Sequence, residues 1–402
     1  QVMKVFINGR YENQVSMTLT FEQMGALLDN FVCWLGCSRD YKGLPGKMDE
    51  FRLWKGTMTT AQVAASFAAG PDTLVNAGGY PLGISLEAPQ QVIAGTATTL
   101  NVYLDYQGVA GVLATDSASV FLSSSDEEVL SIDSRKRLVG VAPGIAEITA
   151  LYEGGVSTTL EVEVLPEQIA LLHRYSFDEG VTDSVGVAHG FLYGPGASVQ
   201  GGELVLDGSV QHAFAQLPAG LVSGLKSMSW EVWFTPGAYI ANWNRLLDFG
   251  QANAGGDGVG YLFASIYTGA ANVRVATRAI GAGEEYFSVA IPDNMQNLTG
   301  QKMHMVYTYA EDGTVTGYLN GQPVSVSGSN TRKLSDIPDY RNYIGRSTYL
   351  NDPPINFTMD EFRIWNGVLG AKEVAANYAS GPEEIPAGED KVDQLLDSLR
   401  KG

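Results

Sequence analysis

The stretch MDEFRLWKGTMTTAQV at residues 48–63 occurs a second time as MDEFRIWNGVLGAKEV at residues 359–374. Eight of the sixteen positions are identical, far more than two unrelated surface segments would share. In both copies the run Met-Asp-Glu-Phe-Arg-Leu/Ile-Trp has the alternation of a β-strand, and a short helix-like stretch follows it. The repeat therefore indicates that one folding unit is present twice.

Three further pairs of segments extend the repeat at almost constant spacing. They are VFINGR at 5–10 with GYLNGQ at 317–322, WLGCS at 34–38 with YIGRS at 343–347, and FAAGPD at 67–72 with YASGPE at 378–383. The offsets are 312, 309 and 311 residues, so the two copies differ by small insertions in loops. Asn-Gly between alternating apolar runs also predicts tight β-hairpins in both copies.

Residues 82–165, between the copies, have a different sequence pattern. Strand-like segments such as TTLNVYLD, AEITALY and TTLEVEVLP alternate with polar turns at short intervals. This pattern predicts a separate all-β sandwich of fewer than a hundred residues. After the second copy, residues 385–402 form a charged tail that is either a docking helix or a frayed terminus. Its apolar residues at helical spacing are Val392, Leu395, Leu396 and Leu399.

Composition excludes several classes of partner. The 402 residues include 25 basic and 44 acidic side chains, a formal net charge of −19, which repels phosphate backbones. Nucleic acid is therefore not an expected partner. No apolar run is long enough to span a bilayer, and any export signal is expected upstream of Gln1. Cys33 and Cys37 are expected to be free thiols, because positions four apart on a strand lie roughly 13 Å apart.

The ordered set of motifs in residues 168–384 resembles a laminin-G-like domain of the concanavalin A-like lectin/glucanase superfamily. The matching pieces are LLHRYSFDEGVTDSVGVAHG, LVLDG, MSWEVWF, RLLDFG, HMVYTY, GYLNGQPV, YIGRS and MDEFRIWNGVL. Residues 82–165 resemble a bacterial immunoglobulin-like domain of group 2 through SSSDEEVLSIDSRKRLVGVAPGIAEITA. Residues 1–75 resemble only the last third of a second laminin-G-like domain. The resemblances imply an all-β chain with a partial jelly roll, an immunoglobulin-like sandwich, a complete jelly roll and a short C-terminal helix.

The first copy is incomplete relative to the second. The complete copy has 147 residues, 168–314, ahead of the point at which the first copy has two. A two-layer sandwich cannot bury its inner faces without its leading strands. Two explanations remain open: the chain continues before Gln1, or a partner protein chain donates the strands that complete residues 1–75.

The sequence favours a protein without catalytic activity. Members of this superfamily that hydrolyse glycans carry Glu-x-Asp-x-x-Glu on one strand, and that string does not occur here. No Gly-x-Ser-x-Gly elbow accompanies the histidines either. His304 lies in a predicted strand and is interpreted as a packed, hydrogen-bonded residue rather than a base.

The resemblance implies a structural Ca²⁺ site. In the family, acidic residues near the first strand and in the last strand meet at the edge of the sandwich; here these are Asp178, Asp183 and Asp360. Calcium needs six to eight oxygen ligands, so carbonyls and water must complete the shell. The alternative is that Asp360 caps a turn or pairs with Arg363. The first copy keeps only the equivalent Asp49.

Two loops carry the candidate ligand-binding side chains. Sugars bind by stacking on exposed rings while amide, carboxylate and guanidinium groups bind their hydroxyls. The segments GAYIANWNRL and RSTYLNDPP supply this mixture, although ordinary loop packing would also account for each residue. The candidates are Tyr239, Trp243, Arg245, Arg346, Tyr349, Asn351 and Asp352.

These observations predict a lectin-like bacterial protein, secreted or on the cell surface, that binds a glycan or another surface ligand through its laminin-G-like modules. The immunoglobulin-like module would be a spacer, and an upstream segment would provide attachment, for instance to the outer membrane. Two alternatives remain: a structural or assembly subunit of a surface complex that binds no sugar, and an accessory region of a larger glycoside hydrolase.

Overall fold

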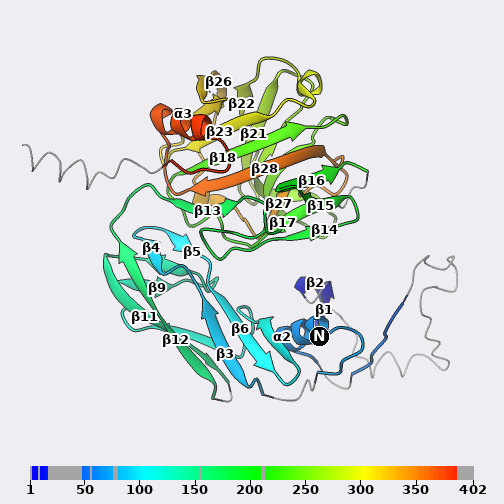
Figure 1. The fold of residues 1–402 in the computed structure, drawn as a ribbon, viewed down its shortest axis with the longest axis vertical. Coiled ribbons are helices and arrows are strands. Elements are labelled where there is room, and N and C mark those ends of the chain that lie inside the picture. The colour runs from blue at the N-terminus through cyan, green and yellow to red at the C-terminus, as the bar shows by residue number, and fades with distance from the viewer. Residues whose placement is uncertain are drawn as a thin grey trace, which may run out of the picture. The chain divides into compact units, whose positions relative to one another are not determined.

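The computed structural model describes residues 2–7, 10–16, 48–54, 57–75, 80–153, 155–209 and 213–386 (Figure 1). Almost all regular structure is β-strand, as the sequence predicted. The chain forms two compact units that alternate along the sequence. Unit 1 comprises 1–87, 101–123 and 148–160, and unit 2 comprises 88–100, 124–147 and 161–402. Cys33, Cys37 and residues 387–402 of the predicted tail lie outside the described residues.

In unit 1, the predicted Asn-Gly hairpin is present. Strands β1 (Val2–Ile7) and β2 (Arg10–Ser16) pair antiparallel, with Ile7 opposite Arg10. The helix predicted after the repeated phrase is α2 (Thr60–Ala68). A capping box begins it, because the Thr59 hydroxyl accepts from the Gln62 N–H at 3.2 Å and the Gln62 amide accepts from the Thr59 N–H at 2.8 Å.

Helix α2 packs on a three-stranded sheet of unit 1. Its buried Ala61 and Ala65 belong to one apolar cluster with Val102, Leu104 and Val112. The sheet has the order β3-β6-β7, with strands β3 (Gly83–Glu87), β6 (Asn101–Tyr106) and β7 (Val109–Leu113). Small alanine side chains let the helix approach the strands closely, so α2 is buried on one face.

The strand predicted at 48–54 is not formed. These residues have no regular secondary structure, and Phe51 and Leu53 are 62% and 90% exposed. A strand needs a neighbour to pair its N–H and C=O groups, and no strand of the described structure pairs with this stretch. The prediction was wrong here because a segment with alternating apolar residues forms a strand only where a neighbouring strand pairs with it.

Residues 88–165 add two small sheets, which confirms the all-β prediction for this region. One has the order β5-β10-β9 and the other β4-β12-β11-β8, with β4 parallel to β12. Their strands are β4 (Gln91–Ile93), β5 (Ala97–Thr98), β8 (Val120–Ser124), β9 (Leu130–Ile132), β10 (Leu138–Gly140), β11 (Gly144–Tyr152) and β12 (Ser157–Leu165). The assignment to the immunoglobulin-like group stays a prediction.

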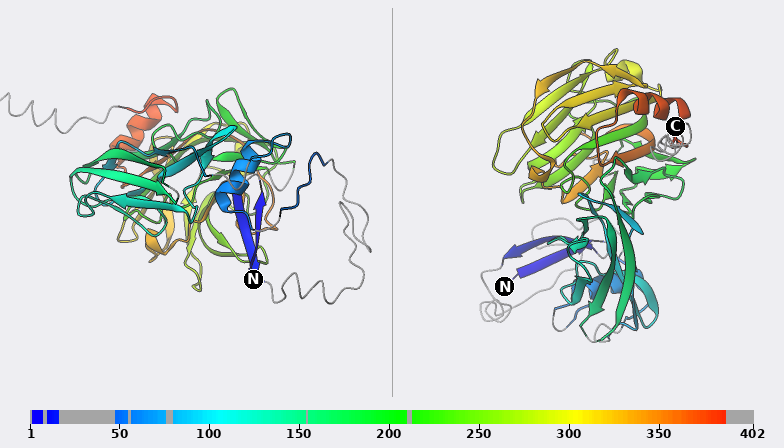
Figure 2. Two further views of the ribbon diagram at one scale, coloured as in Figure 1. Left: turned by 90° about the horizontal axis from the view of Figure 1, so that it is seen from below. Right: turned by 90° about the vertical axis from the view of Figure 1, so that its left-hand side faces the viewer.

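The larger part of unit 2 is a sandwich of two eight-stranded sheets (Figure 2). Sheet 1 has the order β15-β16-β28-β18-β23-β24-β25, with β13 also paired to β28. Its strands are β13 (Leu171–Tyr175), β15 (Ala197–Gln200), β16 (Glu203–Asp207), β18 (Met228–Pro236), β23 (Met303–Tyr309), β24 (Val315–Leu319), β25 (Gln322–Val324) and β28 (Asn356–Trp365).

Sheet 2 has the order β14-β17-β27-β19-β20-β21-β22-β26. Its strands are β14 (Phe191–Tyr193), β17 (Phe214–Leu217), β19 (Arg245–Ala252), β20 (Gly258–Ser265), β21 (Asn272–Arg278), β22 (Glu285–Ala290), β26 (Val326–Ser329) and β27 (Arg341–Ile344). Two short 3₁₀ turns lie between strands: η1 (Met295–Leu298) between β22 of sheet 2 and β23 of sheet 1, and η2 (Leu334–Asp336) between β26 and β27 of sheet 2. Apolar side chains from both sheets form one continuous core.

The second copy of the repeated phrase is the interior strand β28. It pairs with β18 on one side and with β13 and β16 on the other. Phe362 and Ile364 point into the core and are fully buried, in contrast to Phe51 and Leu53 of the first copy. Helix α3 (Ala371–Ser380) covers the outer face of sheet 1, where Val374 contacts a cluster that includes Val306.

Candidate functional site

The outer face of sheet 2 carries a row of polar and aromatic side chains. Strand register places Asp248 opposite Phe263, Phe263 opposite Ala276, and Ala276 opposite Tyr286. Because side chains alternate along each strand, the intervening residues enter the core and this row faces away from it. Arg274, one strand position from Val275, lies on the same outer face.

The 346–354 loop lies against this face and is held there by several hydrogen bonds. The Thr348 N–H donates to Asp248 Oδ2 at 2.8 Å, and Leu350 N–H donates to the Gly256 carbonyl at 2.7 Å. Asn244 Nδ2 donates to the carbonyls of Pro353 and Pro354 at 3.3 and 2.6 Å. The loop therefore covers part of β19 and β20.

Arg245 links the sheet to this loop. Its Nη2 lies 2.9 Å from Asp352 Oδ2 and its Nε lies 3.3 Å from Asp248 Oδ2. The guanidinium also lies over the Phe263 ring at 3.8 Å. Burial raises the pKa of Asp248 to about 6, although the Arg245 charge and the Thr348 N–H oppose the shift. Arg245 and Asp248 therefore hold the loop and are not available to a ligand.

The exposed part of the face includes four side chains that we call the Trp243 platform: Trp243, Arg274, Glu284 and Tyr286. The Arg274 guanidinium lies 5.4 Å from the Trp243 ring centroid and 3.5 Å from that of Tyr286. It also pairs with Glu284. Trp243 and Tyr286 are 38% and 43% exposed, so both rings can be reached from solvent.

Trp243 has an unusual backbone conformation. Its φ is +71°, in the left-handed region that a bulky residue rarely adopts. Two hydrogen bonds fix this geometry: the Trp243 N–H donates to the Tyr267 carbonyl and Arg245 Nη1 donates to the Trp243 carbonyl, each at 3.0 Å. Such strain persists only where the surroundings enforce it, and it is concentrated at functional sites.

The structure brings together four of the seven predicted ligand-binding residues. Trp243, Arg245, Tyr349 and Asp352 lie on or against the outer face of sheet 2, and the Tyr349 ring is 5.9 Å from that of Tyr261. The other three do not contact the platform in the described part of the chain. Arg346 lies over Phe214 and Tyr343, and Tyr239 and Asn351 are exposed.

Sequence reasoning missed Arg274, Glu284 and Tyr286. The segments NVRVATR and EEYFSVA contain a usable signal, because Arg274 and Tyr286 alternate with the core residues Val273, Val275 and Phe287. The missing information was the register that places them beside Trp243.

The three predicted calcium ligands have other partners or lie in solvent. Asp183 is buried and accepts from the N–H groups of Arg174, Gly186 and Ala188, at 3.0, 2.9 and 3.1 Å. His173 Nδ1 lies 2.7 Å from Asp183 Oδ2, the oxygen that also accepts from the Ala188 N–H. These partners hold the pKa of Asp183 below its usual value against the effect of burial.

Asp360 does not pair with Arg363 but with Lys302, whose Nζ lies 2.5 Å from its Oδ2. Lys302 Nζ also lies 3.5 Å from Glu203 Oε1, and Asp178 is exposed. Within the described ranges, no three His, Cys, Asp or Glu side chains form a group that could hold a metal ion. The calcium site stays a prediction, and a cation at Asp360 would have to displace the Lys302 ammonium group.

His304 is a packed residue, as predicted. It is 1% exposed, and its Nε2 lies 3.0 Å from Glu231 Oε1.

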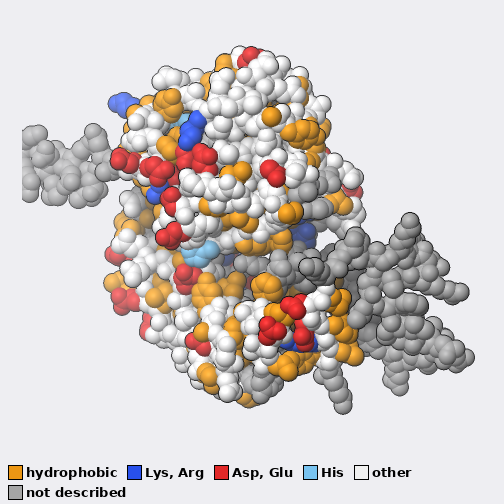
Figure 3. All heavy atoms as spheres, turned by 45° about the vertical axis from the view of Figure 1, so that its right-hand side comes forward, with side chains coloured by type: hydrophobic (Ala, Val, Ile, Leu, Met, Phe, Trp, Pro, Cys, Tyr) orange, Lys and Arg blue, Asp and Glu red, His pale blue; other side chains and the backbone are white. Residues whose placement is uncertain are grey.

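On the face of the molecule in Figure 3, acidic side chains are more numerous than basic ones, in agreement with the net charge. Among the described helices, none has the length and apolar character needed to cross a membrane.

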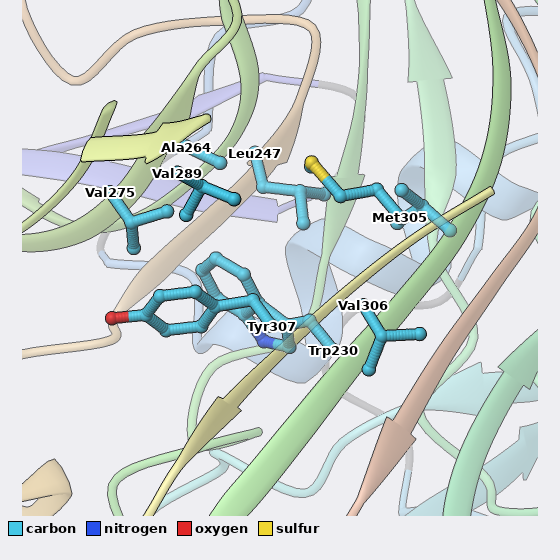
Figure 4. Close-up of a pocket in the computed structure, with 9 residues that line it drawn as sticks. Trp230, Leu247, Ala264, Val275, Val289, Met305, Val306 and Tyr307 are labelled. Atoms are coloured by element: carbon cyan, nitrogen blue, oxygen red, sulfur yellow. The ribbon is translucent and has the colours of Figure 1, made fainter. Parts of the chain in front are cut away.

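A cavity in the core of the sandwich is not a ligand site. Its lining combines side chains of both sheets, including Trp230, Leu247, Val275, Met305 and Tyr307 (Figure 4). Its volume is about 10 Å³, which is room for one water molecule at most. Because its lining is almost entirely apolar, the cavity contributes to packing and not to recognition.

One family model agrees with this fold. Residues 207–375 match the family model described as the concanavalin A-like lectin/glucanases superfamily. Among curated proteins, no match was found. Several solved structures are similar. Domain 4 of AbnA, a GH43 extracellular arabinanase from Geobacillus stearothermophilus, in complex with arabinotriose, is 22% identical, with a TM-score of 0.42, over 52% of this chain and 98% of that chain.

Two other similar structures are more distant in sequence. A botulinum neurotoxin serotype D/C binding domain is 12% identical, with a TM-score of 0.42, over 52% of each chain. Trypanosoma rangeli sialidase in complex with sialic acid is 14% identical, with a TM-score of 0.41, over 70% of this chain and 48% of that chain. The family match and the two-sheet architecture together support a laminin-G-like domain of the concanavalin A-like superfamily at residues 207–375.

Proposed function

We propose that this protein is a non-catalytic glycan-binding protein that acts outside the cell, and that the Trp243 platform binds the sugar. The observation that carries this proposal is the exposed Trp243 ring, held in a left-handed conformation beside Tyr286 and the Arg274–Glu284 pair. Two exposed rings can stack on the apolar faces of a sugar, while the guanidinium and carboxylate groups bind its hydroxyls.

The surroundings of the platform support binding without large rearrangement. Tyr261 Oη donates to Glu284 Oε2 at 2.7 Å, which fixes the carboxylate that pairs with Arg274. Arg274 Nε has no hydrogen-bond partner among the described residues. The platform residues are therefore positioned before a ligand arrives, and this reduces the entropy lost on binding.

A glycan array probed with the full chain tests this proposal. We expect Trp243→Ala and Tyr286→Ala each to weaken binding by about tenfold or more, which corresponds to about 1.4 kcal/mol. Phe121→Ala is the matched control, because Phe121 is an aromatic residue that is 55% exposed and lies on β8, which is not a strand of sheet 2. Full retention of glycan binding in Trp243→Ala would show that the Trp243 platform is not the sugar-binding site.

We also propose that residues 1–75 pack against strands of a partner polypeptide. This proposal rests on the contrast between the two copies: Phe51 and Leu53 are exposed, whereas the equivalent Phe362 and Ile364 are fully buried between strands. In the second copy, the principal neighbour is β18. A strand of similar pattern would satisfy both the backbone and the apolar side chains of 48–54.

A synthetic peptide of residues 228–236, which form β18 in the second copy, provides the test. We expect this peptide to slow amide hydrogen exchange at residues 48–54. The double variant Phe51→Asp/Leu53→Asp should abolish the effect, because charged side chains cannot be buried against the peptide. If exchange at 48–54 is unchanged at saturating peptide, strand addition at this stretch is contradicted.

A further inference from the structure

We infer that the Trp243 platform selects neutral sugars and rejects sugars that carry a carboxylate or sulfate group; this inference rests on the proposed function. The inference follows from the partners of the charged side chains in and around the platform. An anionic sugar is usually recognised by a guanidinium group that has free N–H donors for a bidentate contact. The platform offers its guanidinium group together with a carboxylate.

Arg274 is the guanidinium that a bound sugar would meet first, because it lies between the two exposed rings. Glu284 already pairs with it, and Tyr261 holds Glu284 in that position. An anionic sugar would approach the Glu284 carboxylate as closely as the Arg274 guanidinium. The repulsion would offset the attraction, because the two charges are in direct contact.

The neighbouring charged groups are also paired. Arg245 pairs with Asp352 and with Asp248. Arg332 pairs with Glu285 at 3.2 Å. Neither guanidinium can turn toward an anionic ligand without leaving a carboxylate unpaired, and that loss would be costly because the Asp248 carboxylate is fully buried.

Arg278 is also occupied, by two carbonyl groups and a phenol group. Its Nε donates to the Ala282 carbonyl at 2.9 Å, and its Nη1 donates to the Gly258 carbonyl at 3.3 Å and to Tyr349 Oη at 3.4 Å. Arg346 lies over Phe214 and Tyr343, on strands β17 and β27, and not on the platform. The chain's net charge of −19 adds a general repulsion of polyanions.

An Arg–Glu pair between two rings is well suited to a neutral polyol. The guanidinium donates and the carboxylate accepts, so adjacent hydroxyl groups of one sugar can bind both without any net charge on the ligand. The rings meanwhile contact the C–H faces of the sugar. The same pair that disfavours a carboxylate therefore favours neighbouring hydroxyl groups.

Paired polysaccharides of equal backbone test the inference with the full chain. Fully methyl-esterified and de-esterified polygalacturonate form one pair, and a β-glucan and its C6-oxidised glucuronan form the other. We expect the neutral member of a pair to bind at least about tenfold more tightly, with little change between 50 and 500 mM NaCl because no ion pair forms. Trp243→Ala should lose the binding.

Glu284→Gln is the diagnostic variant, because it leaves the side-chain shape unchanged and frees the Arg274 charge. We expect it to narrow or reverse the preference for the neutral member. Tighter binding of the carboxylated member by the unmodified chain, lost in Trp243→Ala, would overturn the inference while the proposed function stands. If no sugar of either kind binds, the proposed function fails and the inference fails with it.

Discussion

Glu231 Oε1 lies 3.0 Å from His304 Nε2 on the outer face of sheet 1, and both side chains are fully buried. The other carboxylate oxygen, Oε2, accepts hydrogen bonds from Trp365 Nε1 and from Asn377 Nδ2, both at 3.0 Å. One carboxylate thus connects β18, β23, β28 and helix α3. It joins strand β28, which ends at Trp365, to the helix that follows it.

We predict that Glu231→Ala destabilises the sandwich by about 3–5 kcal/mol, because the buried Arg363 guanidinium at 3.5 Å loses a counter-charge and several donors lose their acceptor. Urea denaturation followed by tryptophan fluorescence would measure this loss. Glu179→Ala, at an exposed carboxylate, should stay within about 0.5 kcal/mol of the unmodified chain. Equal midpoints for the two variants would show that the network contributes little to stability.

A second prediction concerns the pH dependence of stability at Asp248. Its pKa is raised from 3.8 to about 6 in the folded state by burial, so between these values the folded state binds the proton more tightly than the unfolded state. The contribution is fully present below about pH 4 and is lost as pH rises through 6. A difference of about two pH units corresponds to about 3 kcal/mol at most.

Asp248→Asn removes this titration. We therefore expect the stability of the variant relative to the unmodified chain to rise between pH 4 and pH 7, measured by urea denaturation at one-unit intervals. Asp116→Asn, at an exposed carboxylate, serves as the control and should follow the unmodified chain. Parallel curves for Asp248→Asn and the unmodified chain would contradict the assigned role of burial.

A third prediction connects the proposed calcium site with Lys302. The Lys302 ammonium group is 2.5 Å from Asp360 Oδ2, where a cation would have to bind. Lys302→Gln removes this competing charge, so we expect Ca²⁺ affinity, measured by isothermal titration calorimetry, to rise by about tenfold or more. Asp360→Asn in the same background should remove the added affinity. Indistinguishable titrations of the unmodified chain and Lys302→Gln would exclude Asp360 as a ligand.

Much of the fold could be predicted because it depends on local pattern. The Asn-Gly hairpin of the second copy is one example: Leu319 pairs with Gln322, and Asn320 and Gly321 have φ values of 49° and 77°. These conformations are ones that Asn and Gly tolerate, so the sequence alone indicated the turn. Strand β28 was predictable for the same reason, because its alternation matches a buried strand.

The candidate site was predictable only in part, because it depends on register between distant strands. Trp243 was found from its loop, but its neighbours Arg274 and Tyr286 are brought to it by the order β19-β20-β21-β22, which the local sequence does not specify. Asp183 shows the opposite case. Its acidic character suggested a metal ligand, whereas the surrounding N–H groups and His173 occupy its oxygens.

The last prediction concerns Asn244, which lies between Trp243 and Arg245 and is fully buried. Its Nδ2 donates to the Pro353 and Pro354 carbonyls, and its Oδ1 accepts from the Ala241 N–H at 2.5 Å. Asn244→Ala leaves these buried groups without partners, at a cost of about 1–3 kcal/mol each where water cannot replace the bond. We expect a loss of stability and, because the 346–354 loop loses an anchor, faster amide exchange at Thr348 and Leu350.

Hydrogen exchange with mass spectrometry distinguishes this local effect from general destabilisation. The amides of β28 should keep their protection while those of the 346–354 loop lose it, since β28 is held by pairing on both sides. Asn242→Ala, two positions earlier and exposed, is the matched control and should leave both segments unchanged. Because Asn244 also fixes the turn that presents Trp243, the variant should weaken glycan binding without touching the ligand; unchanged exchange in the loop would show that Asn244 does not anchor it.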